Sequence, residues 1–257
     1  MSVLSYLEKR ARDALLDNGE KESINTSIST LKTRLNAYFG DDIKEQFRFG
    51  SSTRGTILPR SMDENSDIDY MIVFKDDDSV PQTYLDRLKR FAETYYGRSE
   101  IYQSNPTIVL ELNHIKFDLV PAITSLWSVY KIPNGSGGWL GTDPNDFNTK
   151  LEDKNKNNSS LIKPTIRLAK FWNARNDYPY DSFIFEKQIV DQWYLGCSNQ
   201  KDYLFKVIEN LSADDESTQW RKDKISRAKA IVTEAKRLER DGMPTSAELE
   251  IKKLIPE

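Results

Sequence analysis

Cysteine and histidine are nearly absent from this chain, which has one of each among its 257 residues. The single cysteine, Cys197, excludes a disulfide framework within the chain. The single histidine, His114, excludes a histidine-rich zinc site. Chemistry that needs several of these side chains is therefore excluded, and the scarcity of cysteine leads us to expect a reducing cytoplasm as the compartment.

Long apolar runs and an excess of basic charge are also missing. No apolar run approaches the roughly 20 residues that a membrane-spanning helix needs, so we expect no membrane partner. Lys and Arg total 37 against 40 Asp and Glu, for a net charge of −3. Proteins that grip long nucleic acid usually carry a basic excess, because neutralising phosphates supplies that affinity. Long DNA or RNA is therefore not expected as a required partner.

The first half of the chain shows mixed helix and strand patterns. Apolar spacing predicts helices over 3–18, 22–39 and 82–96, with a brief one over 52–58. Short apolar runs predict strands over 46–49, 69–74, 107–112 and 115–120, the last two joined by a tight turn at Asn113-His114 and the last ended by Pro121. This pattern is typical of a small mixed sheet covered by helices.

The second half is predicted to be helical. Residues 131–160 are rich in Gly, Pro, Asn and charge, which indicates a crossing between two lobes. Helices are predicted over 161–175, 182–197, 201–211, 217–240 and 246–254. We therefore expect an α+β fold, with a mixed-sheet catalytic lobe over 1–140 and a helical lobe over 141–257 that closes a cleft.

One segment, from Phe49 to Tyr70, combines features of a phosphate site and a metal site. Asp67 and Asp69 are two residues apart in a predicted strand, so both side chains project from one face. Two neighbouring carboxylates repel each other unless a cation neutralises them, and Mg²⁺ takes carboxylate and phosphate oxygens together. The Gly50-Ser51 turn upstream offers backbone N–H groups and a hydroxyl to a phosphate. The segment predicts half of a nucleotidyl-transfer site.

A third carboxylate completes the pattern. Asp118 lies in a later predicted strand that we expect to neighbour the first. Two Mg²⁺ ions about 3.5–4 Å apart need such a cluster: one ion stabilises the leaving pyrophosphate and the other lowers the pKa of an acceptor hydroxyl. This chemistry needs no side-chain nucleophile, which suits a chain with one His and one Cys. Mn²⁺ is expected to substitute for Mg²⁺.

These motifs resemble those of a known superfamily. Gly50-Ser51, Asp67-x-Asp69, and Asp118 within FDLVP match the polymerase-β-type nucleotidyltransferases. The longer pattern, FGSSTRGT, SDIDYMIVF, FDLVPA, IRLAKFWN and DSFIFE, looks like the branch of bacterial cyclic-oligonucleotide synthetases. That branch acts in anti-phage signalling and is related to cyclic GMP-AMP synthase. The resemblance covers roughly residues 45–190.

The resemblance implies a role for each matching residue. Gly50 and Ser51 would hold the β- and γ-phosphates, and Asp67, Asp69 and Asp118 would be catalytic metal ligands. Lys163 and Ser182 match positions where relatives contact the triphosphate, and Phe183 would neighbour the base. Lys163 is followed by Pro164, so we expect it in the first turn of its helix. Nucleoside triphosphates would be the substrates, and a downstream effector would respond to the cyclic product.

Two other functions stay open from the sequence. One is nucleotidyl transfer to an RNA 3′ end, a protein or a small molecule, although the helical half shows no clear basic surface for a tRNA. The other is a catalytically silent nucleotide-binding scaffold, against which the three intact aspartates argue. Lys163 and Ser182 also have structural interpretations, as a lysine near a helix start and as a helix N-cap.

Overall fold

The computed structural model describes residues 2–75, 78–124, 130–213 and 218–257. Its contacts divide the chain into two compact units, which we call the sheet unit and the helical unit. The sheet unit comprises Leu16–Arg60 and Glu64–Asp146. The helical unit comprises Met1–Leu15, Ser61–Asp63 and Phe147–Glu257. Residues 1–15, which the predicted division assigned to the first lobe, thus make their contacts with the C-terminal helices.

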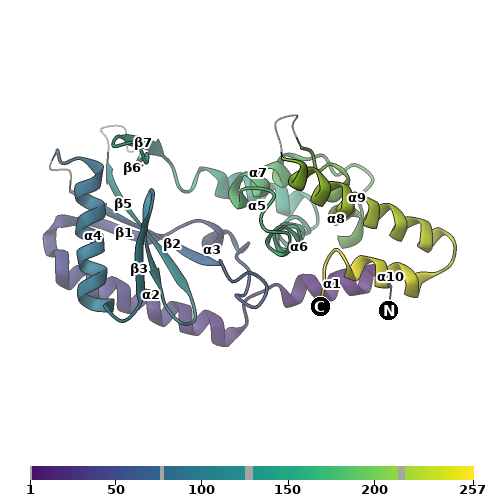
Figure 1. Ribbon diagram of the computed structural model, residues 1–257, viewed down its shortest axis with the longest axis horizontal. Coiled ribbons are helices and arrows are strands. Elements are labelled where there is room, and N and C mark those ends of the chain that lie inside the picture. The colour runs from purple at the N-terminus through teal and green to yellow at the C-terminus, as the bar shows by residue number, and fades with distance from the viewer. Residues whose placement is uncertain (1, 76–77, 125–129, 214–217) are drawn as a thin grey trace. The chain divides into compact units, whose positions relative to one another are not determined.

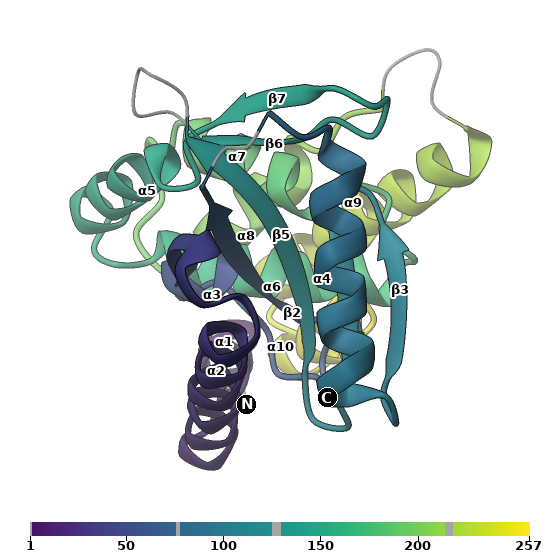
Figure 2. The same ribbon diagram turned by 90° about the vertical axis from the view of Figure 1, so that its left-hand side faces the viewer.

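The sheet unit is built on one mixed sheet of seven strands (Figure 1). Five of them lie in the order β1-β2-β5-β4-β3, and β6 and β7 extend the sheet beyond β5 (Figure 2). Only β2 and β5 pair in parallel among the described strands; the other pairs are antiparallel. The strands are β1 (Ile43–Arg48), β2 (Asp67–Phe74), β3 (Glu100–Ser104), β4 (Thr107–Glu111), β5 (Lys116–Thr124), β6 (Tyr130–Pro133) and β7 (Trp139–Thr142). The predicted α+β class and mixed sheet are confirmed.

Two helices, α2 (Asn18–Phe39) and α4 (Pro81–Tyr96), cover one face of this sheet. A capping box between Asp17 and Glu20 begins α2, and a proline at its first position begins α4. Both helices bury an apolar stripe against alternate residues of β2, β4 and β5. The resulting core includes Leu31, Leu35, Ile72, Phe74, Tyr84, Phe91, Phe117 and Leu119. This face of the sheet is therefore covered by α2 and α4, and functional side chains can lie only on the opposite face.

The opposite face of the sheet carries a smaller apolar cluster. Met71 and Val73 of β2 and Val120 and Ala122 of β5 form it, with Phe47 of β1 packed against them. Side chains alternate across a strand, so residues two positions before Met71 and Val120 share this face. Asp69 and Asp118 occupy those positions, and Asp67 shares the face two residues before Asp69. The small helix α3 (Ser51–Arg54) follows β1 and contacts β2.

The helical unit is organised around α6 (Ile162–Arg175), most of whose side chains are buried. It packs against α1 (Val3–Asp13), α7 (Ser182–Asp191) and α8 (Gln200–Glu209). The remaining helices are α5 (Asp146–Asn157), α9 (Gln219–Arg240) and α10 (Pro244–Lys252). The Tyr6 hydroxyl of α1 donates to the Ile255 carbonyl at 2.6 Å, so the two ends of the chain are tied together. Within the described residues, no helix is long and apolar enough to span a membrane.

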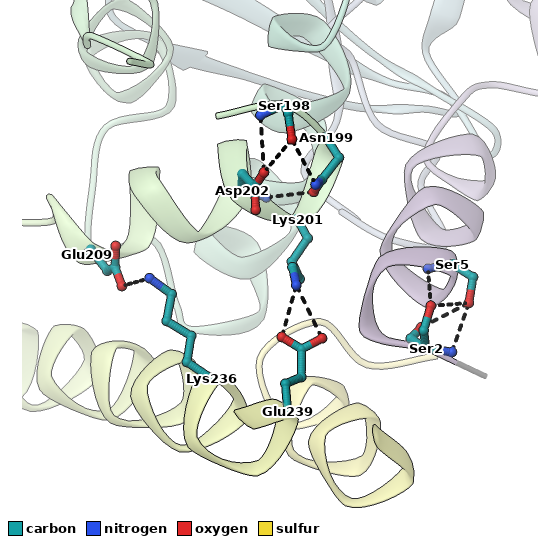
Figure 3. A network of polar contacts seen from close by, with 9 residues as sticks. All are labelled: Ser2, Ser5, Ser198, Asn199, Lys201, Asp202, Glu209, Lys236 and Glu239. Carbon is teal, nitrogen blue, oxygen red and sulfur yellow. Dashed lines mark hydrogen bonds and ion pairs between the residues drawn. The ribbon is translucent and has the colours of Figure 1, made fainter. Parts of the chain in front are cut away.

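Polar contacts join α8 to α9 at the surface of this unit (Figure 3). Lys201 donates to both carboxylate oxygens of Glu239, at 3.2 and 2.9 Å. Lys236 of α9 pairs with Glu209, the last residue of α8. Asn199 caps the start of α8 by accepting from the Asp202 N–H at 3.1 Å. Each exposed pair contributes less than about 1 kcal/mol, so burial of α8 and α9, rather than these pairs, stabilises the contact.

The stretch 131–160, interpreted as a crossing between lobes, contains regular structure that was not predicted. The sheet unit ends within it, at Asp146, but the stretch also holds the β6–β7 hairpin and α5. Its Gly- and Asn-rich part is the hairpin turn, where the Asn134 side chain accepts from the N–H groups of Ser136 and Gly138, both at 2.9 Å. Asn and Gly are favoured in such turns because they make local hydrogen bonds and tolerate positive φ. The composition therefore marked a turn within the sheet unit.

Pro121 was expected to end a strand, and that prediction is wrong because β5 continues to Thr124. Proline lacks the N–H that a neighbouring strand would accept. Pairing of β5 with β4 stops at Leu119, and pairing with β6 starts at Ile123. Pro121 lies in this gap, so no hydrogen bond to β4 or β6 is lost through its missing N–H.

The predicted helices in the second half are confirmed, with different ends. The helix predicted over 182–197 ends at Asp191, and residues 192–199 form the loop to α8. The helix predicted over 217–240 is α9, whose described part starts at Gln219; residue 217 lies outside the described residues. The edge strand β3 was not predicted, because its side chains are mostly exposed and give only a weak apolar signal.

Candidate active site

Three carboxylates lie together on the free face of the sheet. Asp69 of β2 is in register with Asp118 of β5, its parallel neighbour. Asp67 lies two residues before Asp69, so it projects from the same face of β2. We predicted that the strand with Asp118 neighbours the strand with Asp67 and Asp69. The parallel pairing of β5 with β2 confirms this prediction.

The Gly50 turn closes tightly on Asp69. The Phe49 N–H donates to the Asp69 carbonyl at 3.0 Å, which draws the end of β1 along β2. Gly50 follows with φ of +72°, a left-handed conformation that favours glycine. A Cβ at this position would lie 1.8 Å from Oδ2 of Asp69, closer than any two such atoms approach. Gly50 is therefore required both by its backbone angle and by the carboxylate beside it.

Ser51 begins α3 directly after this glycine. Its carbonyl accepts from the N–H groups of Thr56 and Ile57, at 3.1 and 3.2 Å, which fixes the turn after α3. The Gly50-Ser51 turn is thus part of the same local structure as the carboxylates, as the sequence segment suggested.

Asp118 is partly buried and has a perturbed acidity. Burial, and to a smaller extent the negative charge of Asp67, raise the pKa of Asp118 from 3.8 to about 6. Its Oδ1 is buried and has no hydrogen-bond partner among the described residues. A buried carboxylate oxygen without a donor is costly, and a metal ion is one way to satisfy it.

Lys116 supplies a positive charge to this cluster. It is in register with Asp67 across the β2–β5 pair, and its Nζ lies 3.7 Å from Oδ2 of Asp67. Its charge also lowers the pKa of Asp118, against the larger effect of burial. The sequence analysis assigns no role to Lys116, which lies on the same face of β5 as Asp118. The available signal was its position two residues before Asp118.

The donor set fits a divalent metal ion. Three carboxylates on one face, one with an orphaned oxygen, are oxygen ligands of the type that Mg²⁺ prefers. In the arrangement observed, no three acidic, histidine or cysteine side chains within the described residues converge closely enough to hold an ion.

The helical unit contains the other two predicted site residues. Lys163 lies in the first turn of α6, as expected from the proline that follows it. Its backbone N–H donates to the Asn155 side chain at 3.0 Å, and its Nζ pairs with Glu152 of α5. Ser182 is the first residue of α7, but it is not the N-cap: Asp181 accepts from the N–H groups of Phe183 and Ile184. The cap interpretation of Ser182 is therefore wrong.

Phe183 is available for contacts at the start of α7. Its ring is 43% exposed and meets Phe147 edge-on, with the ring centroids 5.7 Å apart. The Lys187 ammonium lies 5.4 Å from its centroid. This contact has the geometry of a cation–π interaction.

The fold and the carboxylate set define a nucleotidyltransferase-type domain: a mixed sheet, a glycine-serine turn and three aspartates on adjacent strands. Residues 1–155 match the family described as "Second Messenger Oligonucleotide or Dinucleotide Synthetase domain". This match spans more than half of the chain, and the protein belongs to that family.

Individual relatives agree with this assignment. A probable cyclic nucleotide synthase of Bacillus cereus is 31% identical over 140 residues, which is 48% of this chain and 42% of the relative. The alignment thus spans less than half the length of that relative. The DncV cyclic AMP-GMP synthase of Vibrio cholerae superposes with a TM-score of 0.77 at 10% identity, covering 100% of this chain and 96% of that one. CdnC of Escherichia coli MS115-1, solved with ATP, gives 0.74 at 14% identity, covering 100% and 98%. These structures share the fold.

Replacing Gly50 tests the close approach to Asp69. We expect Gly50→Ala to lower nucleotide turnover by about 100-fold or more, since a displacement of about 1 Å at reacting groups has that effect. Gly55→Ala is the matched control, because Gly55 has the same φ of +72° but a Cβ there would meet nothing within 4 Å. Steady-state kinetics and urea unfolding of both variants make the comparison. Equal turnover of the two variants would contradict the requirement for space beside Asp69.

The pKa of Asp118 predicts a pH dependence of stability. Because its pKa is raised to about 6 in the folded protein, the folded state holds a proton that the unfolded state releases. The stabilisation is complete below about pH 4 and is lost as the pH rises through about 6. In metal-free buffer the free energy of unfolding should therefore fall by about 2 kcal/mol more in the wild type than in Asp118→Asn between about pH 4 and 7. Parallel pH profiles from urea unfolding would contradict this.

Proposed function

We propose that this protein is a template-independent nucleotidyltransferase that joins nucleoside triphosphates into a cyclic di- or oligonucleotide second messenger. The observation that carries the proposal is the register of Asp69 with Asp118, with Asp67 on the same face. Membership of the second-messenger synthetase family supports the same reaction class. A ribose hydroxyl of one nucleotide attacks the α-phosphorus of another, the bond to the leaving pyrophosphate breaks, and a second such step closes the ring.

Asp67, Asp69 and Asp118 would hold the metal ions of this reaction. Two Mg²⁺ ions, for which Mn²⁺ can substitute, would neutralise the triphosphate and lower the pKa of the attacking hydroxyl. The chain's own contribution is to fix the carboxylates on two paired strands, which preorganises their spacing. Asp118 adds a buried carboxylate whose raised pKa favours a bound cation, because a cation removes the cost of its charge.

Four residues are proposed to bind the triphosphate: Gly50, Ser51, Lys163 and Ser182. Gly50 and Ser51 offer a turn without a blocking side chain, next to Asp69. Lys163 and Ser182 offer an ammonium and a hydroxyl, the donor types that complement a phosphate chain besides the metal. Lys163 would exchange Glu152 for phosphate, since that ion pair is partly exposed and weak. Phe183 would stack on a base.

The substrates would be free nucleotides. The relatives solved with ligands carry ATP in CdnC of Escherichia coli and GTP in CdnG of Bradyrhizobium diazoefficiens, the latter with a TM-score of 0.73. We propose that this protein acts in the cytoplasm in anti-phage defence, where its product acts on a separate effector. A long nucleic acid is not required as acceptor, in keeping with the net charge of −3.

The first test is product analysis of an Asp69→Asn variant. Wild-type protein incubated with radiolabelled triphosphates and Mg²⁺ or Mn²⁺ should yield small products that resist phosphatase. Asp69→Asn should abolish them while the far-UV circular dichroism and the unfolding midpoint stay near wild type, because one ligand is lost and the shape is kept. Exposed Asp41→Asn is the charge-matched control. Label on added RNA or protein would support transfer to another acceptor, and the absence of any turnover would support a silent scaffold.

Lys163 generates a second test. Lys163→Ala should raise the apparent KM for nucleoside triphosphate by about ten-fold or more, since a charge-assisted contact to phosphate contributes about 1.5–3 kcal/mol. The concentration of metal needed for half-maximal rate should change less. Lys156→Ala, in which an exposed lysine of the neighbouring α5 is removed, controls for loss of charge. An unchanged KM would return Lys163 to a purely structural role beside Glu152.

A further inference from the structure

A lysine lies among the carboxylates that would hold metal. Lys116 of β5 pairs in register with Asp67 of β2, and its Nζ approaches Oδ2 of Asp67 to 3.7 Å. Its side chain is 16% exposed, against 31% for that of Asp67, so the ion pair is largely withdrawn from water. A charge held in this position is screened much less than one on the surface.

The position of Lys116 follows from the strand itself. Lys116, Asp118 and Val120 alternate with Phe117 and Leu119, which are buried under α2 and α4. Lys116 is thus held on the free face of the sheet by the packing of its neighbours. Lys116 and Asp118 are two residues apart in β5, so their side chains share this face. One ammonium therefore contacts Asp67 and lies on the same face as Asp118, two of the three proposed metal ligands.

A metal ion and this ammonium compete for the same oxygens. Asp67 is paired with Lys116. In this arrangement no three acidic, histidine or cysteine side chains in the described part of the chain lie close enough to hold a metal ion. Binding a divalent cation also brings its charge close to that of Lys116, and like charges a few ångströms apart repel strongly in a partly buried site.

We propose that Lys116 is an internal counter-ion that keeps the carboxylate site closed to free divalent metal. The ammonium stabilises Asp67 and Asp118 in the metal-free protein and raises the concentration of metal needed to displace it. A nucleoside triphosphate offers an alternative partner for the ammonium, so the metal would enter together with the nucleotide. Lys116 is in this sense a positioning residue, and the inference rests on the proposed metal-dependent function.

The test measures Mn²⁺ binding to nucleotide-free protein by electron paramagnetic resonance of the unbound ion. Lys116→Met keeps most of the apolar stem and removes the charge, and it should bind Mn²⁺ at least about ten-fold more tightly than the wild type. Lys116→Arg keeps the charge and should bind as weakly as the wild type. Damage to the fold would not raise affinity, so a gain cannot come from a merely structural role.

Two controls locate the effect. Lys44→Met removes a lysine of β1 that donates to Thr124, at the far end of β5 from Asp118, and it should leave Mn²⁺ binding unchanged. Adding Asp69→Asn to Lys116→Met should abolish the tight site. The proposal is overturned if Lys116→Met binds Mn²⁺ no more tightly than the wild type, if Lys44→Met gains equally, or if the gain survives Asp69→Asn.

The binding measurement is independent of product formation. If the protein makes no cyclic product but Lys116→Met gains affinity for Mn²⁺, the proposed function fails while the role of Lys116 stands. If cyclic product forms and Mn²⁺ affinity does not change, the role of Lys116 fails alone. Unfolding in metal-free buffer adds a second readout: Lys116→Met should be less stable than the wild type, and Mn²⁺ should restore its stability.

Discussion

The parallel pairing of β2 with β5 is the constraint on which the site depends. It places Asp69 beside Asp118 and Asp67 beside Lys116, so one register sets both the carboxylates and their counter-ion. A shift of one residue would turn these side chains to the face that α2 and α4 cover. The apolar partners of the same strands, such as Ile72 and Phe117, prevent that shift because they must stay in the core. Packing on one face therefore fixes the chemistry on the other.

The two faces of the sheet contribute to stability with opposite signs. The core face gains free energy from burial, whereas the free face concentrates negative charge in a partly buried position. The raised pKa of Asp118 and its orphaned oxygen record that cost. Unfavourable repulsion between carboxylates, held in place by a well-packed sheet, is typical of a site that binds a cation.

Some of this could be predicted from the sequence and some could not. The two-residue spacing of Asp67 and Asp69 and the strand around Asp118 are local patterns, and they indicated the shared face. The approach of Gly50 to within contact of Asp69 depends on how β1 pairs with β2, which no local pattern reports. The β6–β7 hairpin was missed because its turn composition resembles that of a linker. Pro121 was wrongly predicted to end its strand for a related reason. Its missing backbone N–H disrupts a sheet only where a carbonyl of the neighbouring strand would accept from it.

Lys116 shows why local patterns fall short at the site itself. Its sequence neighbours are those of any amphipathic strand, and an exposed lysine is the ordinary expectation there. Lys116 can act as a counter-ion only because the sheet places Asp67, some fifty positions earlier in the chain, opposite it. An ammonium in that place neutralises the carboxylates when no metal is bound and opposes a metal that arrives alone. The sheet register thus sets the geometry of the ligands and also the charge against which a cation must compete.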